Sequence, residues 1–297
     1  MAVQPFHDRD GWVWMDGSFV PQREAKVHLL THAMHYASCV FEGERAYGGA
    51  IFKSREHSER LAHSGKIMGF RVPYEPEEID RAKRELIAKM GFEDCYIRAL
   101  AWRGSEQLGV SAKANTIHCA IATWQWGDYF ADKMQGIRLM IAPWRRPAPD
   151  TAPANAKAAG LYMICTLSKH AAEDAGFNDA LMFDWRGQIA EATGANIFFI
   201  RDGVIHTPTP DCFLNGLTRQ TVIALARQRG IDVVERAIFP NELATFTEAF
   251  LTGSAAEITP IREIAGLAFK PAALTEQLLH DFAALTRGRA NAAPAAA

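Results

Sequence analysis

The sequence has 297 residues, of which 48% are hydrophobic and 22% charged, and its formal net charge is −2, values typical of a globular protein with one large or two ordinary domains. The near-neutral charge does not favour nucleic acid or an anionic membrane as a partner, and no apolar run is long enough to span a membrane. Five scattered cysteines without a CxxC pair, and a start without the apolar core of a secretory signal, favour a cytoplasmic protein.

The first half of the chain predicts a small α/β domain, which we place at residues 1–125. Turn residues, helix boundaries and alternating apolar positions define its elements. They are a hairpin over 12–20 turning at Asp16-Gly17, a strand pair over 44–53 turning at Gly48-Gly49, a helix over about 55–69 capped by Ser54, a helix from Pro76 to residue 90 ended by Gly91, and strands over 95–102 and 116–126.

Three features of this half are candidates for function. His28, His32 and His35 could share one face of a helix, which raises the alternative of a metal-binding protein, but the HExxH carboxylate and a cysteine pair are both missing, so we expect no metal. Arg55 falls in the first turn of a helix, where a cation is mildly unfavourable unless an anion binds nearby. Tyr96 and Arg98 are two residues apart in a strand and therefore share a face.

The second half predicts a larger domain over residues 137–288, after a linker at 126–136 and before a disordered tail at 289–297. The pattern predicts a strand at 137–144, a helix at 161–175, one strand up to the polar corner 184–188, a second running through to Ile200 and a third at 203–210. A helix capped by Thr218, a strand at 231–238, a short helix near 240–246, a strand from 248 and a helix at about 272–287 follow.

Two isolated charged residues stand out in this half. Lys157 lies in a loop rich in proline and alanine, and Glu191 lies inside an otherwise apolar strand. A buried carboxylate is costly unless a cation or several donors hold it, so Glu191 has either an arginine partner or a bound positive group. The helix start at Leu217-Thr218 and the turn Ser254-Ala255-Ala256 offer backbone N–H groups to an anion.

A lysine, a carboxylate for a ring nitrogen and donors for a phosphate together suit pyridoxal 5′-phosphate. The segments HAMHYASCVFEGERAY, KSREHSERL, YIRAL, KAAGLY, AEATGANIFF, LNGLTRQTV and LTGSAAEITP resemble the fold type IV, or class IV, pyridoxal-phosphate enzymes, and among them the branched-chain amino acid aminotransferases. The resemblance covers residues 10 to 287, nearly the whole chain. It implies a small N-terminal α/β domain, a larger domain with a barrel-like sheet, and a homodimer or dimer-based oligomer.

The resemblance also implies roles for individual residues. Lys157 corresponds to the Schiff-base lysine that moves the substrate proton, and Glu191 to the carboxylate on the pyridine nitrogen, which the resemblance favours over an arginine as its partner. The other cofactor-binding residues implied are Arg55, Tyr162, Asn196, Leu217, Thr218 and Ser254. The substrate-binding residues implied are Tyr36, Phe41, Tyr96, Arg98, Trp126, Tyr129, Ser254, Ala255 and Ala256, with Arg98 on the second carboxylate of 2-oxoglutarate.

The implied reaction is transamination of L-leucine, L-isoleucine or L-valine with 2-oxoglutarate. The sequence departs from the family pattern at Ala37, where glycine is common, at Glu44, where an aliphatic residue is common, and in the loop 104–115. These positions line or flank the substrate pocket, so related activities stay open. They are a class IV transaminase for D-amino acids or (R)-amines with pyruvate, and a lyase of the aminodeoxychorismate type.

Overall fold

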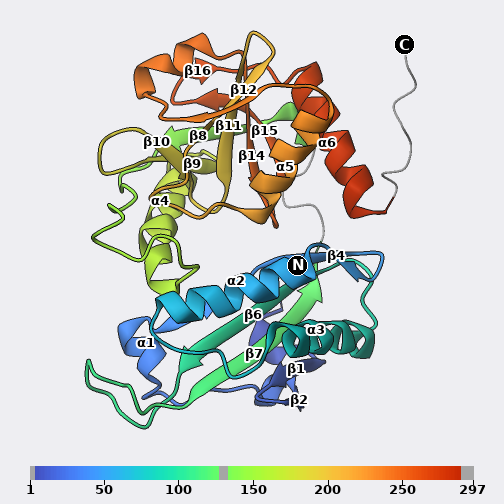
Figure 1. Ribbon diagram of the computed structural model, residues 1–297, viewed down its shortest axis with the longest axis vertical. Helices are drawn as coiled ribbons and strands as arrows, with labels where there is room; N and C mark the ends of the chain where they lie inside the picture. Colours follow the sequence, from blue (N-terminus) through green and yellow to red (C-terminus); the bar gives the residue numbers. More distant parts are fainter. Residues whose placement is uncertain (1–3, 127–132, 289–297) are drawn as a thin grey trace. The chain divides into compact units, whose positions relative to one another are not determined.

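The computed structural model describes residues 4–126 and 133–288, and the chain forms two compact units. Among these residues, the first unit contains 4–126 and the short segment 156–160, and the second contains 133–155 and 161–288 (Figure 1). Lys157 therefore belongs to the first unit, although the chain on both sides of its segment belongs to the second. The domain boundaries expected from the sequence remain a prediction, because the linker falls largely on residues outside the described ranges.

Seven strands form the sheet of the first unit, in the order β2-β1-β7-β6-β4-β5 with β3 beside β6. They are β1 (Trp12–Met15), β2 (Ser18–Pro21), β3 (Cys39–Phe41), β4 (Glu44–Tyr47), β5 (Ala50–Ile51), β6 (Cys95–Arg103) and β7 (Ile117–Gln125). Both predicted hairpin turns are present, with positive φ angles at Gly17, Gly48 and Gly49. The helical segments are η1 (Phe6–Asp8), η2 (Gln22–Glu24), α1 (His32–Tyr36), α2 (Ser54–Ile67) and α3 (Pro76–Met90).

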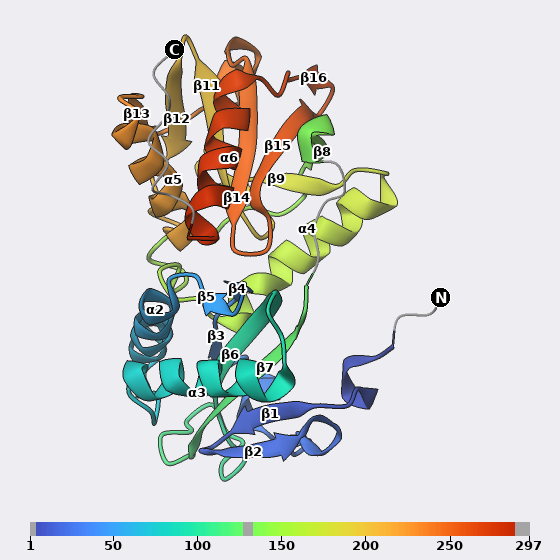
Figure 2. The ribbon, with the colours of Figure 1, turned by 90° about the vertical axis from the view of Figure 1, so that its right-hand side faces the viewer.

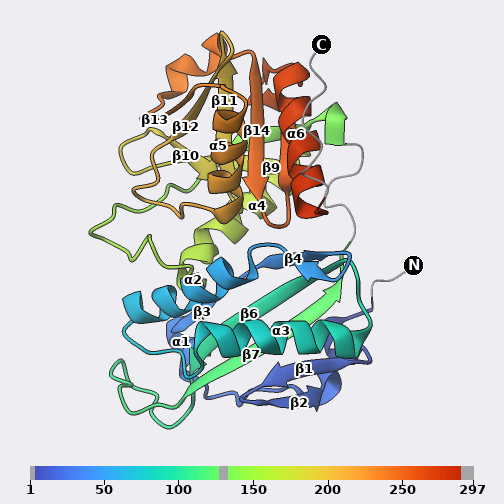
Figure 3. The same ribbon diagram turned by 45° about the vertical axis from the view of Figure 1, so that its right-hand side comes forward.

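Helices α2 and α3 lie side by side across one face of this sheet (Figure 1 and Figure 3). Helix α3 begins at Pro76 and ends before Gly91, as predicted, and Glu75 and Glu78 form its capping box. The prediction that Ser54 caps α2 was wrong. Lys53 occupies the N-cap position in a left-handed conformation, while the Ser54 hydroxyl donates to Asp80 of α3.

The second unit is built on a nine-stranded sheet in the order β10-β9-β8-β15-β14-β11-β12-β13, with β16 beside β15. Its strands are β8 (Ile137–Ile141), β9 (Asp179–Phe183), β10 (Ile189–Ala192), β11 (Asn196–Arg201), β12 (Val204–Pro208), β13 (Val233–Arg236), β14 (Glu248–Gly253), β15 (Glu257–Ile264) and β16 (Leu267–Ala268). Because β10 also pairs with β11, the strands from β10 to β11 close into a ring. This confirms the predicted α/β class with a barrel-like sheet.

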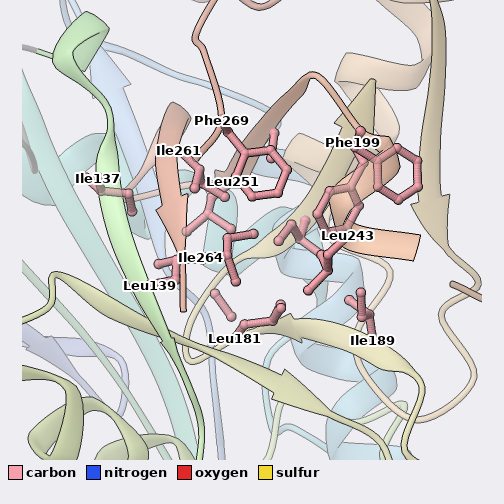
Figure 4. Packing of buried hydrophobic residues seen from close by; sticks show 14 of the residues in the cluster. Ile137, Leu139, Leu181, Ile189, Phe199, Leu243, Leu251, Ile261, Ile264 and Phe269 are labelled. Carbon is pink, nitrogen blue, oxygen red and sulfur yellow. The ribbon is translucent and has the colours of Figure 1, made fainter. Parts of the chain in front are cut away.

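The core of the second unit is made by alternate residues of these strands. Ile137 and Leu139 of β8, and Ile197 and Phe199 of β11, are each two residues apart and belong to one buried cluster. Figure 4 labels three of them, Ile137, Leu139 and Phe199. Full burial of each such side chain stabilises the fold by roughly 1.5–3 kcal/mol. The inward-facing positions of these strands therefore carry apolar side chains, and polar side chains can occur only at the other positions.

Helical segments connect or follow the strands of this sheet. They are η3 (Lys133–Gln135), η4 (Ala159–Tyr162), which begins in the first unit, α4 (Met163–Asp174), α5 (Leu217–Gln228), η5 (Pro240–Thr245) and α6 (Ala273–Thr286). Helices α5 and α6 lie next to each other along β14 (Figure 2). Helix α5 begins at Leu217 with Gly216 as its N-cap, so the prediction that Thr218 caps it was wrong. In the described ranges, no helix combines the length and apolarity that crossing a membrane requires.

Candidate active site

Glu191 is turned out of the barrel core by a local irregularity of its strand. The pairing of β10 with β9 shifts register between Ile189 and Glu191, as in a β-bulge. As a result Ile189 and Ala192 both belong to the core cluster, and Glu191 is freed from the inward face. The single second strand expected up to Ile200 was wrong. Small residues at 193–195 make a tight turn between β10 and β11, and this turn sets Glu191 directly opposite Asn196.

The carboxylate of Glu191 has two polar partners within the second unit. Arg146 Nε lies 3.4 Å from one oxygen, and Asn196 Nδ2 donates to the other at 3.1 Å. The sequence-based expectation that its partner is a pyridine nitrogen rather than an arginine is therefore wrong in one respect, because an arginine is present as well. The carboxylate side chain keeps 13% of its surface exposed.

Arg146 is 4% exposed and anchors this side of the site. Its Nε also donates to the Cys212 carbonyl at 3.4 Å, and its Nη1 to the Leu161 carbonyl at 3.4 Å. Burial works against the charged form, yet the pKa of Arg146 is raised above its ordinary value, mainly by the Glu191 carboxylate. The pair thus holds two opposite charges that compensate each other in a dry environment.

Asn196 connects Glu191 to the start of α5. Its Nδ2 also donates to the Leu214 carbonyl at 3.0 Å, and its Oδ1 accepts from the N–H of Gly216 at 3.2 Å. A side chain at Gly216 would bring a Cβ within 2.4 Å of that oxygen, so the approach requires glycine. The contact fixes the first turn of α5, where the N–H groups of Leu217 and Thr218 have no partner inside the helix.

The turn Ser254-Ala255-Ala256 joins β14 to β15, and it lies at the end of the strand that pairs with β11. Thr252 pairs with Asn196 across those strands. Its hydroxyl is buried, and it has no hydrogen-bond partner among the described residues. The turn and the Asn196 group are therefore brought to one edge of the barrel.

Tyr162 is the last residue of η4 and the N-cap residue of α4. Its phenol is close enough to Arg146 to help raise the pKa of that guanidinium. In the second unit, Arg146 thus lies near both Tyr162 and Glu191, and Glu191 in turn contacts Asn196.

Within the first unit, the Phe41 ring contacts two cations. Lys157 Nζ is 5.0 Å and Arg98 Cζ is 4.7 Å from the centre of its ring. Cation–π contacts of this kind are worth about 0.5–2 kcal/mol. Nearby, burial raises the pKa of the Cys39 thiol to about 11, against the opposing effect of Arg98. This thiol is therefore neutral at ordinary pH.

An aromatic wall continues from Arg98. Arg98 Cζ is 5.5 Å from the Tyr96 ring, and the Tyr96 and Trp126 rings are 5.1 Å apart. The Tyr96 hydroxyl fills the space above Gly43, where a Cβ would lie only 1.9 Å from it. The structure brings together Lys157, Phe41, Arg98, Tyr96 and Trp126. Tyr129 lies outside the described residues.

Two predicted site residues, Tyr36 and Arg55, contact other side chains of the first unit. Tyr36 is 46% exposed and stacks on His32 with ring centres 4.6 Å apart. Arg55 is half-exposed and ion-paired with Glu59 and Glu77, whose hydrogen bonds raise its pKa. A phosphate at Arg55 would have to compete with both carboxylates, and its role stays a prediction.

The three histidines are engaged in hydrogen bonds of the fold. His32 contacts the Ser38 hydroxyl and the Gly109 carbonyl, His35 contacts the Leu29 carbonyl, and His28 accepts from the N–H of Leu30. Among the described residues, the grouping with metal-ligand spacing is instead Asp184, Asp211 and Cys212. Arg186 bridges its two carboxylates, so it forms an ion-pair network.

Sequence reasoning missed Arg146 and Thr252 as neighbours of Glu191 and Asn196. Arg146 lies 45 residues before Glu191, in a segment that we described only by its prolines and small residues. The one available signal was the cost of burying Glu191, which demanded a cation without saying which one.

Residues 39–264 match the family model described as amino-transferase class IV. The chain is 40% identical to a branched-chain-amino-acid aminotransferase of Pseudomonas aeruginosa, over 96% of each chain. Its fold matches a branched-chain aminotransferase of Thermoproteus uzoniensis with norvaline, with a TM-score of 0.92 and 37% identity, covering 95% of this chain and 97% of that one. It also matches a T.th. branched-chain amino acid aminotransferase complexed with N-(5′-phosphopyridoxyl)-L-glutamate, with a TM-score of 0.91, 37% identity and 95% of each chain covered.

Proposed function

This chain belongs to the class IV aminotransferases, and we propose that it uses pyridoxal 5′-phosphate to transfer the amino group of L-leucine, L-isoleucine or L-valine to 2-oxoglutarate. The observation that carries the proposal is the whole-length similarity to branched-chain aminotransferases, in sequence and in fold. The structural neighbour in complex with a phosphopyridoxyl-glutamate supports both the cofactor and the acceptor.

The residues present fit this cofactor. A pyridine nitrogen needs a negative partner, and Glu191 offers a carboxylate that Arg146 and Asn196 already hold in place. A phosphate needs donors, and the first N–H groups of α5, with Ser254 and the buried hydroxyl of Thr252, are of the right kind. Lys157 supplies the amine that attaches the cofactor, Tyr162 a phenol for its ring oxygen, and Arg55 stays the additional phosphate-binding residue that we propose.

When bound, the cofactor supplies an electron sink for negative charge at the substrate Cα. Lys157 Nζ would take the proton from that carbon and deliver it to C4′ of the cofactor, so that the proton moves from Cα to C4′ in each half-reaction. Glu191 holds the proton of the pyridine nitrogen by accepting its hydrogen bond. Arg146 and Asn196 orient the Glu191 carboxylate, which leaves it ready to accept.

The aromatic wall suits a branched aliphatic side chain. We assign Phe41, Tyr96 and Trp126 to its pocket, with Tyr36 and Tyr129 as further proposed members. Arg98 takes the second carboxylate of 2-oxoglutarate or glutamate, because its guanidinium presents paired donors. The turn Ser254-Ala255-Ala256 takes the α-carboxylate with its backbone N–H groups.

A donor panel on the purified holoenzyme tests this function. We expect L-leucine, L-isoleucine and L-valine to be active with 2-oxoglutarate, each giving its 2-oxo acid in a one-to-one ratio with glutamate. Activity with D-alanine or an (R)-amine and pyruvate, without activity on the L-amino acids, would assign the chain to another class IV reaction. Product without a matching amino acceptor would indicate a lyase.

We further propose a homodimer and a cytoplasmic location. Exposed apolar side chains from two stretches of the first unit support the dimer, with Leu29 at 70%, Met34 at 59% and Val110 at 86% exposure. The five cysteines are all thiols, which fits a reducing compartment.

A further inference from the structure

The backbone of Lys157 is held from two sides within the first unit. Its carbonyl accepts from the N–H of Phe41 at 3.1 Å, and its own N–H donates to the hydroxyl of Ser64 at 3.0 Å. The segment itself is irregular, and an isolated bridge joins Ala158 to Val40. Long side chains such as lysine are mobile, so the position of Nζ depends on how firmly this short stretch of backbone is fixed.

Ser64 is fully buried on α2, and its surroundings keep that helix from shifting. At the next position, Gly65, even a Cβ would come within 3.0 to 3.2 Å of Val72 and Phe70, so the helix packs closely there. One turn earlier, Arg60 donates to both oxygens of buried Glu42 at 2.7 Å. The Ser64 hydroxyl therefore sits at a fixed point.

The same helix also fixes the other side of the lysine. Glu42 follows Phe41 in the chain, and its carboxylate accepts from His57 at 2.7 Å as well as from Arg60. Helix α2 thus holds Phe41 through Glu42 and holds Lys157 through Ser64. Helix α2 therefore sets the distance between the Lys157 backbone and the Phe41 ring, which the lysine amine contacts.

We propose that Ser64 is a positioning residue that returns the amine of Lys157 to one place in every turnover. The inference rests on the proposed role of Lys157. In the proposed reaction this amine would both hold the cofactor and move a proton at the substrate Cα, so it would have to come back to the same position after each turnover. A hydroxyl acceptor at residue 64 defines that place without touching substrate.

The test compares Ser64→Ala, Ser64→Cys and Ser64→Thr with the parent full-length chain. The first readout is the rate at which added pyridoxal 5′-phosphate attaches covalently to the apo chain, followed by visible absorbance and borohydride trapping. We expect attachment and kcat to fall about ten- to a hundredfold in Ser64→Ala, with KM nearly unchanged. Ser64→Cys, a weaker acceptor, should fall less, and Ser64→Thr, which keeps the hydroxyl, should stay near the parent.

Ser58→Ala is the matched control, because Ser58 is also fully buried on α2 but bonds Lys83 and the Ser54 carbonyl. It should lower the melting temperature without slowing attachment. Equal slowing by Ser58→Ala, parent-like attachment in Ser64→Ala, or slow attachment in a folded Ser64→Thr would each overturn the inference alone. A parent chain that takes up no cofactor would overturn the proposed function and this inference together.

Discussion

At the scale of single residues, two of the three departures from the family pattern, Ala37 and Glu44, have physical explanations. Ala37 ends α1 in the left-handed region, with φ 52 and ψ 26, where glycine is favoured and an L-residue is strained by roughly 1–2 kcal/mol. Glu44 is buried and paired with Lys83, whose ammonium lies 2.7 and 2.8 Å from its two oxygens. The first departure costs stability, and the second is compensated by a partner.

Replacing Ala37 by glycine should therefore stabilise the protein. We expect the free energy of unfolding, measured with denaturant, to rise by about 0.5–1 kcal/mol, the relief of strain less the added entropy of the unfolded chain. Ala33→Gly is the control, since Ala33 lies inside the same helix and should lose about 1 kcal/mol. A loss in both variants would show that φ at residue 37 carries no strain.

Replacing Glu191 by glutamine should cripple catalysis while keeping the fold. Glutamine retains the shape and can still accept from Asn196, but it cannot hold the proton of a pyridine nitrogen. We expect kcat to fall at least about a hundredfold, with the cofactor still bound as judged by visible absorbance. Glu263→Gln, in the partly exposed pair with Arg138 of the same barrel, should keep parental activity. Parental turnover in Glu191→Gln would contradict the role given to this carboxylate.

At the scale of elements, the sequence predicts helices and turns where local chemistry decides them and fails where a distant partner decides. Pro76 and Gly91 fix both ends of α3, but nothing near Lys83 reveals that it is buried, because its partner Glu44 is 39 residues away. The turn at 193–195 was missed because its small residues do not interrupt an apolar pattern. The Arg146–Glu191 pair, likewise, joins positions far apart in sequence.

The Lys83–Glu44 pair gives a prediction for α3. Lys83→Met should leave a buried carboxylate without its cation and lower the free energy of unfolding by about 3–5 kcal/mol. The double variant Glu44→Leu with Lys83→Met should recover most of that loss, because a well-packed apolar pair can replace a buried ion pair. Arg81→Met on the exposed side of α3 should change stability by less than about 0.5 kcal/mol. If the double variant does not recover the lost free energy of unfolding, the ion pair contributes more to stability than the cost of burying its two charges.

Helix α2 should make the protein sensitive to acid through Glu42. Burial alone would raise the pKa of this carboxyl, but Arg60 and His57 outweigh it and hold the pKa well below 4.5. A carboxyl with a lowered pKa stabilises the fold above its unfolded pKa, and this contribution is lost as pH falls towards the folded pKa. Below about pH 4.5 the slope from one such group approaches about 1.4 kcal/mol per pH unit.

Denaturant unfolding at pH 6, 4 and 3 measures this effect. The parent should lose more stability on acidification than Glu42→Gln, which has no carboxyl to protonate at this position. Burial raises the pKa of Glu44 and Asp179, so these groups act in the opposite direction and only the comparison isolates Glu42. Equal losses in parent and variant would contradict the assignment.

At the scale of the whole molecule, motifs spread over the chain predicted the fold class, the cofactor and the reaction class. They did not predict which hydrogen-bond and ion-pair partners individual residues have. The exposed apolar group of Leu29, Met34 and Val110 gives the prediction at this scale. Light scattering should find about twice the 32.8 kDa mass of one chain. Leu29→Asp with Val110→Asp should shift the mass towards one chain, because charges at an apolar contact are costly to bury.

Phe239→Asp is the control for this measurement. Phe239 is also an exposed apolar side chain, at 48%, but it belongs to the second unit. Its replacement should leave the mass unchanged. A parent protein of single-chain mass would contradict the dimer without affecting the assignment of the reaction.

The membership of residues 156–160 in the first unit has a consequence for how the protein is made. The strand that receives Ala158, and the helix that receives the Lys157 N–H, emerge from the ribosome long before the lysine itself. At a translation rate of about 5–20 residues per second, residues 156–160 of the first unit are synthesised several seconds after residue 126. The nascent unit therefore matures only once translation has passed residue 160. For the same reason, a chimera that takes residues 1–126 from a relative would contain that relative's Ser64 and Phe41 positions, which contact the lysine backbone, but not the relative's own lysine segment.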